Sequence, residues 1–271
     1  MKTMVFITGD VHHPPDFIKR LWYGELKLRE DYEIKAGFEF VKILSEHEVP
    51  CTLFITGKLC DTFPETVNAL LLNDNVEIGA NTYYAFRGPL YGYTLLIPVY
   101  RRIFGASYGP KLLIRHDVFK TTYAFRKLRV QTIAWRTHGY EGNDYLYSLL
   151  AKVGYKIASD CRSNTFKFFK RYGIFHVCIN MPVDDLLPNM PPKERSRWYE
   201  KYLKLLNIKA KREKVLVLQL HPANMALDDF DFLLKVIKTL LKLNASFHKI
   251  SFLVSNGVLK SQRGDYMCAK P

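Results

Sequence analysis

A chain of 271 residues, of which 48% are apolar and 24% charged, can build a sizeable hydrophobic core, which excludes an intrinsically disordered protein. Its apolar runs are too short to cross a bilayer, and Gly9-Asp10 interrupts the first run before it could act as a signal peptide. We therefore expect one domain covering residues 1–271, without a transmembrane segment and located in the cytoplasm.

The formal net charge of +14 is concentrated in two stretches. Residues 101–130 carry +7 and residues 193–214 carry +6. A basic surface attracts anionic partners such as phosphates, nucleic acid, acidic glycans or lipid headgroups. The alternative is a solvated, lysine-rich helix face without a partner.

The cysteines are five in number and contain no C-x-x-C pair. An odd count without metal-ligand spacing predicts buried or free thiols in a reducing compartment, and neither a disulfide nor a zinc framework. The five are Cys51, Cys60, Cys161, Cys178 and Cys268.

Short β-branched or aromatic runs predict buried strands, and stretches with helical spacing lie between many of them. Strands are expected at 4–8, 50–56, 75–79, 130–135, 155–159, 174–179, 215–220 and 249–254, and helices at 35–48, 64–72, 143–152 and 228–243. Apolar strands that alternate with helices are typical of an α/β protein with a parallel sheet covered on both faces. This many strands favours a single-domain (β/α) barrel, irregular or incomplete, over an open doubly wound sheet.

Residues 83–108 break this alternation with many aromatic residues separated by glycine and proline. We expect a long, structured insertion near the barrel mouth. It could act as a lid or as an aromatic platform for a sugar ring, or it could be an ordinary packed excursion.

Polar residues follow several of the predicted strands, where the chemistry of parallel α/β proteins gathers. In chain order they are Asp10, His12, His13, Asn81, Arg136, His138, Asp160 and His221. Carboxylates, an arginine and several histidines around one mouth are the composition expected of acid–base hydrolysis.

Five segments resemble, in the correct order, motifs of the polysaccharide deacetylase family of carbohydrate esterases. They are PCTLFITG at 50–57, VEIGANT at 76–82, AWRTHGY at 134–140, LLAKVGYKIASD at 149–160 and LVLQLHP at 216–222. The resemblance covers roughly residues 3–255. It implies a distorted (β/α) barrel of about seven strands that hydrolyses a non-peptide C–N bond, usually the acetamide of an N-acetyl sugar.

The resemblance also implies roles for individual residues. Asp10 matches the catalytic base and Arg136 the arginine that contacts it. His221 matches the general acid that protonates the leaving amine, and Asp160 matches the carboxylate that orients and charges this histidine. With Arg136, we expect His138 and Asn81 to contribute to substrate binding.

The metal ligands of that family fall here on Val11, Asn81 and Ala85. The standard metal site is therefore not expected, because zinc prefers cysteine, histidine and carboxylate ligands. Asp10 with His12 or His13 are the candidates for a rebuilt site. A divalent metal such as zinc stays open as a cofactor.

Three functions are compatible with the sequence. The first is a deacetylase-like hydrolase of carbohydrate metabolism that acts on a small-molecule or glycan substrate, which the basic charge would allow to be anionic. The second is a family member without catalytic activity that binds a carbohydrate or an anionic ligand. The third is a basic protein that binds nucleic acid or a membrane surface, although no helix-turn-helix, zinc finger or sheet-borne aromatic motif supports it.

Overall fold

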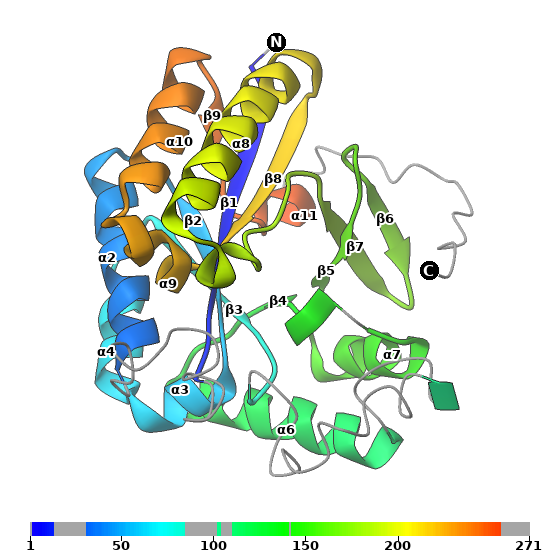
Figure 1. Ribbon diagram of the computed structural model, residues 1–271. Helices are drawn as coiled ribbons and strands as arrows, with labels where there is room; N and C mark the ends of the chain where they lie inside the picture. The colour runs from blue at the N-terminus through cyan, green and yellow to red at the C-terminus, as the bar shows by residue number, and fades with distance from the viewer. Residues whose placement is uncertain (1, 14–30, 85–101, 104–109, 141, 256–271) are drawn as a thin grey trace.

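The computed structural model describes residues 2–13, 31–84, 102–103, 110–140 and 142–255 (Figure 1). Within these residues, nine strands form one sheet, in the order β6-β7-β5-β4-β3-β2-β1-β8, with β9 paired to β1. The strands are β1 (Met4–Val11), β2 (Cys51–Ile55), β3 (Val76–Ala80), β4 (Ala134–Trp135), β5 (Ile157–Arg162), β6 (Phe168–Arg171), β7 (Ile174–Ile179), β8 (Val215–Leu220) and β9 (Ser246–Phe247).

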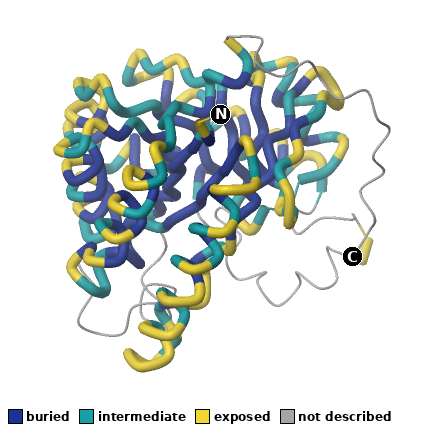
Figure 2. Tube along the Cα trace, turned by 90° about the horizontal axis from the view of Figure 1, so that it is seen from above, coloured by how far each residue is buried: buried dark blue, intermediate teal, exposed yellow. Residues whose placement is uncertain are grey.

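Helices cover the outside of this sheet. They are α2 (Tyr32–Glu46), α3 (Gly57–Thr62), α4 (Pro64–Leu71), α6 (Lys111–Lys127), α7 (Asp144–Val153), α8 (Pro192–Arg212), α9 (Pro222–Met225), α10 (Asp231–Lys242) and α11 (Phe252–Ser255), with short 3-10 turns η3 (His138–Tyr140), η4 (Leu187–Asn189) and η5 (Ala226–Asp228). Seen from above, the strands are mostly buried and the exposed residues lie mainly on the outer helix faces (Figure 2). None of the helices in the described part of the chain is long and apolar enough to cross a membrane.

The strands β8, β1, β2, β3, β4, β5 and β7 pair in parallel, and β6 adds an antiparallel hairpin at β7. Asn180 connects the two outer strands of this series, β7 and β8. Its side chain donates to the carbonyl of Val215 at 3.0 Å and accepts from the amide of Val217 at 2.7 Å. Its own amide donates to the carbonyl of Val217 at 3.3 Å. The seven parallel strands therefore close into a distorted barrel, as the sequence predicts.

The alternation of side chains along β1 separates two hydrophobic cores. Phe6 belongs to the core that also contains Phe54 and Val217, whereas Val5 and Ile7 belong to the core that lies under the helices. Successive side chains of a strand point to opposite faces. Asp10, four residues after Phe6, therefore shares the face of the barrel interior.

The C-terminal part of the predicted pattern is wrong. Residues 249–254 do not form a strand but a turn that leads into α11. Ile250 and Leu253 are the buried members of this run. Their three-residue spacing suits a helical turn and not the two-residue period of a strand.

The prediction for the cysteines is also wrong in part. Cys161 of β5 and Cys178 of β7 form a disulfide, with 4.5 Å between their Cα atoms. The two residues are register partners on neighbouring strands, which a separation of 17 residues does not reveal. Cys51 and Cys60 are free and buried, and burial raises the pKa of both thiols to about 12.

Two predictions fall largely or wholly outside the described residues. Of the aromatic insertion at 83–108, the structure describes residues 83–84 and 102–103. Cys268 also lies outside the described part of the chain.

Candidate functional site

A buried ion pair joins the end of β1 to the residue after β4. Nη1 of Arg136 donates to Oδ1 of Asp10 at 2.6 Å, and both side chains are almost entirely buried. Nη2 of Arg136 also donates to the hydroxyls of Thr8 at 2.9 Å and Ser159 at 2.8 Å, and Nε donates to the carbonyl of Ser159 at 3.1 Å. The guanidinium lies over the ring of Phe54 at 4.1 Å. These bonds fix the arginine fork and hold Asp10 in place.

A second carboxylate–cation pair stands across the same mouth. Nδ1 of His221 lies 2.7 Å from Oδ1 of Asp184, and the backbone amide of His221 donates to Oδ2 of Asp184 at 2.8 Å. Asp185 is farther from the same imidazole, at 3.8 Å. Burial alone would lower the pKa of His221, but the charge and hydrogen bond of Asp184 outweigh it and raise this pKa to about 10. His221 therefore carries a proton at neutral pH.

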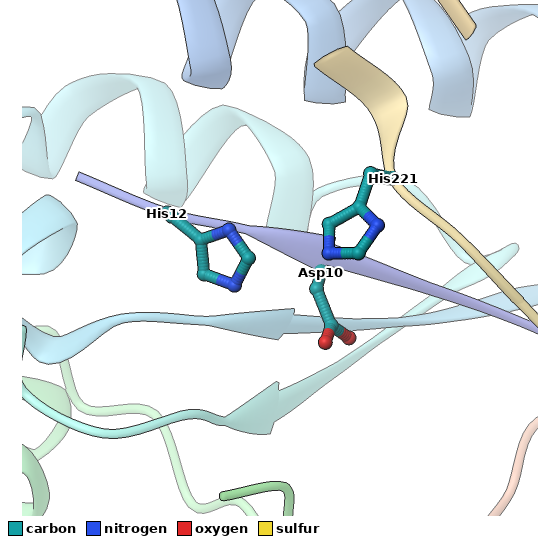
Figure 3. A group of neighbouring side chains, drawn as sticks. All are labelled: Asp10, His12 and His221. Carbon is teal, nitrogen blue, oxygen red and sulfur yellow. The ribbon is translucent and has the colours of Figure 1, made fainter. Parts of the chain in front are cut away.

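His12 lies between these two pairs. One ligand atom each of Asp10, His12 and His221 lie within 4.8 Å of one another, and Figure 3 shows the three side chains gathered at the end of β1. Nε2 of His12 is 3.3 Å from Nδ1 of His138. Burial and the positive charge of His221 lower the pKa of His12 to about 3. The site thus combines a carboxylate, a neutral imidazole and a protonated imidazole.

Three predicted residues take other positions. Asp160 does not orient His221: its carboxylate accepts from the amide of Thr137 at 2.6 Å and from the hydroxyl of Thr137 at 2.8 Å. Burial raises the pKa of Asp160 to about 6. The expected pairing is therefore wrong, and Asp184 takes this place.

Asn81 and His13 are also not part of the group formed by Asp10, His12 and His221. Oδ1 of Asn81 accepts from the amide of Thr82 at 2.7 Å. The ring of His13 faces Phe63, with 6.0 Å between the ring centroids. The adjacent histidines His12 and His13 therefore differ in that only His12 belongs to this group.

Sequence reasoning missed Asp184 and Asp185. Both follow β7, and no site candidate is predicted after that strand or after β2. Asp184 lies five residues beyond the strand end and 37 residues before His221. Examining the end of 174–179 like the other strand ends would have found the two carboxylates.

The residues at the family's metal-ligand positions do not fit a metal ion. Val11 is buried in the core under the helices, and its side chain has no metal-ligand atom. It packs closely against Gly37 of α2, where an added Cβ would lie 3.1 Å from Cγ2 of Val11. Oδ1 of Asn81 is occupied by Thr82, and Ala85, outside the described residues, has no donor atom.

Two other groups among the described residues could be considered for a metal. One is Asp10, His12 and His221, and the other is Asp184, Asp185 and His221. Asp10 is already paired with Arg136, and His221 is already paired with Asp184. A cation in the first group would face the Arg136 guanidinium, and in either group it would have to displace the proton of His221, so its binding would be opposed. This donor set suits proton transfer better than metal binding.

A scan of the sequence against protein-family models gives no match, and neither does a search of curated proteins. Solved structures do match. A putative polysaccharide deacetylase from Mycobacterium smegmatis has a TM-score of 0.63 at 16% identity, covering 91% of this chain and 93% of its own. The allantoinase PuuE has a TM-score of 0.66 at 10% identity, covering 95% of this chain and 93% of its own.

A CE4 family pseudoenzyme from Bacillus anthracis also matches, with a TM-score of 0.56 at 12% identity, over 93% of this chain and 66% of its own. Identities this low establish the fold and not the activity. The chain therefore has the fold of these polysaccharide deacetylase and CE4 structures, and this is the fold that the resemblance of its motifs implies.

Proposed function

We propose that this protein hydrolyses a non-peptide C–N bond, as in the N-deacetylation of an N-acetyl sugar or the opening of a related amide, without the metal of the polysaccharide deacetylases. The observation that carries the proposal is the buried Asp10–Arg136 pair opposite a protonated His221 that is held by Asp184. A carboxylate and an imidazolium within 4.8 Å of one another can serve as a base and an acid for the same reacting group.

In the first step, Asp10 accepts a proton from a water molecule while the water oxygen bonds to the carbonyl carbon of the amide. The carbonyl π electrons move to its oxygen and give a tetrahedral oxyanion. Arg136 cannot take the proton from Asp10, because a guanidinium has no acceptor. Its role is to position the carboxylate.

His12 is the residue that we assign to the oxyanion. It lies beside both Asp10 and His221, and its low pKa leaves it a neutral imidazole that can donate one N–H. A donor placed where negative charge develops stabilises the transition state in an environment that excludes water. This donor would take over part of the charge stabilisation that a metal gives in other members of the fold.

In the second step, the C–N bond breaks and His221 transfers its proton to the leaving nitrogen. Amines leave poorly unless they are protonated, so this acid is needed. The products are an amine and a carboxylic acid. Asp10 then holds the proton taken from water, and its return to His221 through solvent completes the cycle.

Binding without turnover is the second candidate function. The replacement of the family's metal ligands by Val11 and Asn81 favours it, because these side chains do not fit a metal. A structural neighbour described as a pseudoenzyme shows that this fold also occurs in a protein of that description.

The test is a hydrolysis assay on protein as purified and after removal of metals by a chelator. The substrates are N-acetylglucosamine oligosaccharides, followed by acetate release, and a cyclic ureide, followed by mass spectrometry. We expect turnover that survives chelation and falls by about 10²–10⁴-fold in Asp10→Asn and in His221→Gln. The exposed Asp74 provides the matched control, Asp74→Asn, which should retain activity.

Each other result has a definite meaning. Turnover that is lost on chelation and restored by zinc would contradict the metal-free mechanism. Saturable binding of the oligosaccharide without product would favour the second candidate.

A further inference from the structure

A groove lies between α6 and α7, apart from the residues assigned to catalysis. Its main hollow has a volume of about 670 Å³, and a second hollow of about 330 Å³ adjoins it near the C-terminal end of α6. Volumes of this size are typical of ligand sites. The two helices each contribute one face at helical spacing, so the lining is set by well-ordered elements.

The groove is cationic. Arg115, Arg126 and Lys152 line the main hollow, and Arg126 and Arg129 line the second. The described lining of both hollows contains no carboxylate. Within the described part of the chain, none of these four cations makes an ion pair. Such a surface attracts anions, and the arginine fork matches carboxylate, sulfate and phosphate groups.

Aromatic rings separate the cations. Phe119 and Tyr123 of α6 are 46% and 61% exposed, which is high for side chains of this size, and Tyr145 of α7 lies across from them. Arg115 and Arg126 are eleven residues apart on one helix, which places them about 16 Å apart along its axis. Cations already lie over two of the rings, Arg115 over Phe119 at 5.6 Å and Lys127 over Tyr123 at 4.9 Å. The ligand that fits this pattern has widely spaced charges separated by rings that pack on the exposed parts of these aromatic side chains.

An acidic glycan in which charged and neutral sugars alternate has these properties. A single-stranded nucleic acid carries a phosphate at each nucleotide and would be matched by cations along the whole groove. A lipid surface would be matched by a flat or convex face, whereas these side chains line a hollow.

The second basic stretch shows what distinguishes the groove. On α8, Arg197 and Lys204 are exposed, but the aromatic residues between them pack inward. Trp198, Tyr199 and Tyr202 all contact Phe232 of α10. The α8 cations therefore stand on a solvated face without exposed rings.

From these observations we infer that the groove between α6 and α7 is a binding site for an acidic glycan chain. The inference does not depend on hydrolysis, because the groove can be tested by binding alone.

The experiment is calorimetric titration of the full chain, at low salt, with a hyaluronan hexamer, which carries one carboxylate on every second sugar. We expect the double variant Arg115→Gln/Arg126→Gln to weaken binding by about tenfold or more, since it removes two charge-assisted contacts. The matched control Arg197→Gln/Lys204→Gln changes the net charge equally on α8 and should leave binding within about twofold. Tyr123→Ala should weaken binding without any change in charge. All five positions are exposed, and thermal unfolding checks that each variant is folded.

Several results would overturn the inference. One is that the wild type does not bind the hexamer. Another is that the two double variants lose the same affinity, which would indicate general charge attraction. Tighter, groove-dependent binding of oligothymidylate or of anionic phospholipid vesicles would assign the groove to nucleic acid or to a membrane instead.

Discussion

Two carboxylate–cation pairs with buried carboxylates meet at the barrel mouth, and they differ in whether the cation can release its proton. Asp10 and Arg136 are 2.6 Å apart, and Asp184 and His221 are 2.7 Å apart. A guanidinium stays protonated at any physiological pH, whereas an imidazolium can give up its proton. The first pair thus positions a base and the second holds an acid, although their geometry is nearly the same.

The two pairs should therefore respond differently to pH. The folded-state pKa of His221, about 10, lies above the ordinary value of 6.5. Folding then stabilises the protonated form, so this contribution is complete below pH 6.5 and is lost as the pH rises to about 10. A guanidinium gives no such pH dependence, because it is not deprotonated in proteins.

The largest expected effect comes from breaking the Asp10–Arg136 pair. Arg136→Met leaves Asp10 as a buried charge without a partner, and we expect the free energy of unfolding to fall by about 3–5 kcal/mol in a urea titration. The control is Lys127→Met, whose exposed pair with Asp61 at 3.2 Å should be worth less than about 1 kcal/mol. If both variants lost the same free energy of unfolding, burial of the Asp10–Arg136 pair would not increase its contribution to stability.

Next in size is the effect of the imidazole that lies between the pairs. His12→Gln should lower kcat by about 10²–10³-fold with a smaller change in KM, because the oxyanion donor acts mainly in the transition state. The neighbouring His13, whose ring faces Phe63, provides the control His13→Gln and should leave kcat almost unchanged. Loss of bound zinc in His12→Gln but not in His13→Gln would instead identify His12 as a metal ligand.

A smaller effect is expected when the Asp184–His221 pair is altered. Asp184→Asn removes the charge that raises the pKa of His221, so the alkaline limb of the kcat/KM profile should move down by about 1–3 pH units. An NMR titration of the His221 ring should move in the same direction. The stability of the variant should also depend less on pH between 6.5 and 10. An unmoved limb would mean that His221 is not the acid.

The smallest effect is expected from the outer carboxylate. Asp185 is 3.8 Å from Nδ1 of His221 and its side chain is 39% exposed. Asp185→Asn should therefore shift the same limb downward by less than about one pH unit. A shift as large as that of Asp184→Asn would show that the two carboxylates share the task.

The sequence predicts the part of the site that depends on local strand patterns. Asp10 and Arg136 stand directly at strand ends, and the family motifs indicate both. The Asp184–His221 contact depends on the closure of the barrel between β7 and β8, which no local pattern reports. Asp160 illustrates the same limit, because its side chain is held by Thr137, a contact that depends on how two neighbouring strand ends are placed.

The fold follows the same rule. Most of the continuous apolar runs form strands as predicted, although the run at 249–254 forms a turn and α11. β6, with the polar residues Lys170 and Arg171, gives no such signal. The disulfide depends on the register of β5 and β7, which is irregular between Ala158 and Cys161. Neither feature can be read from spacing along the chain.

The closure of the barrel by Asn180 has a consequence for His221, the proposed general acid. Asn180, the residue that follows β7, bonds to β8 through its side chain and its backbone amide. Asp184 and His221, which follow the same two strands, form a second link. The Asp184–His221 pair therefore also helps to hold β7 and β8 together where the barrel closes. Separation of β7 from β8 would lower the pKa of His221. Deprotonation of His221 would reduce the free energy of barrel closure by the same amount. Protonation of His221 and closure of the barrel are in this way one coupled equilibrium.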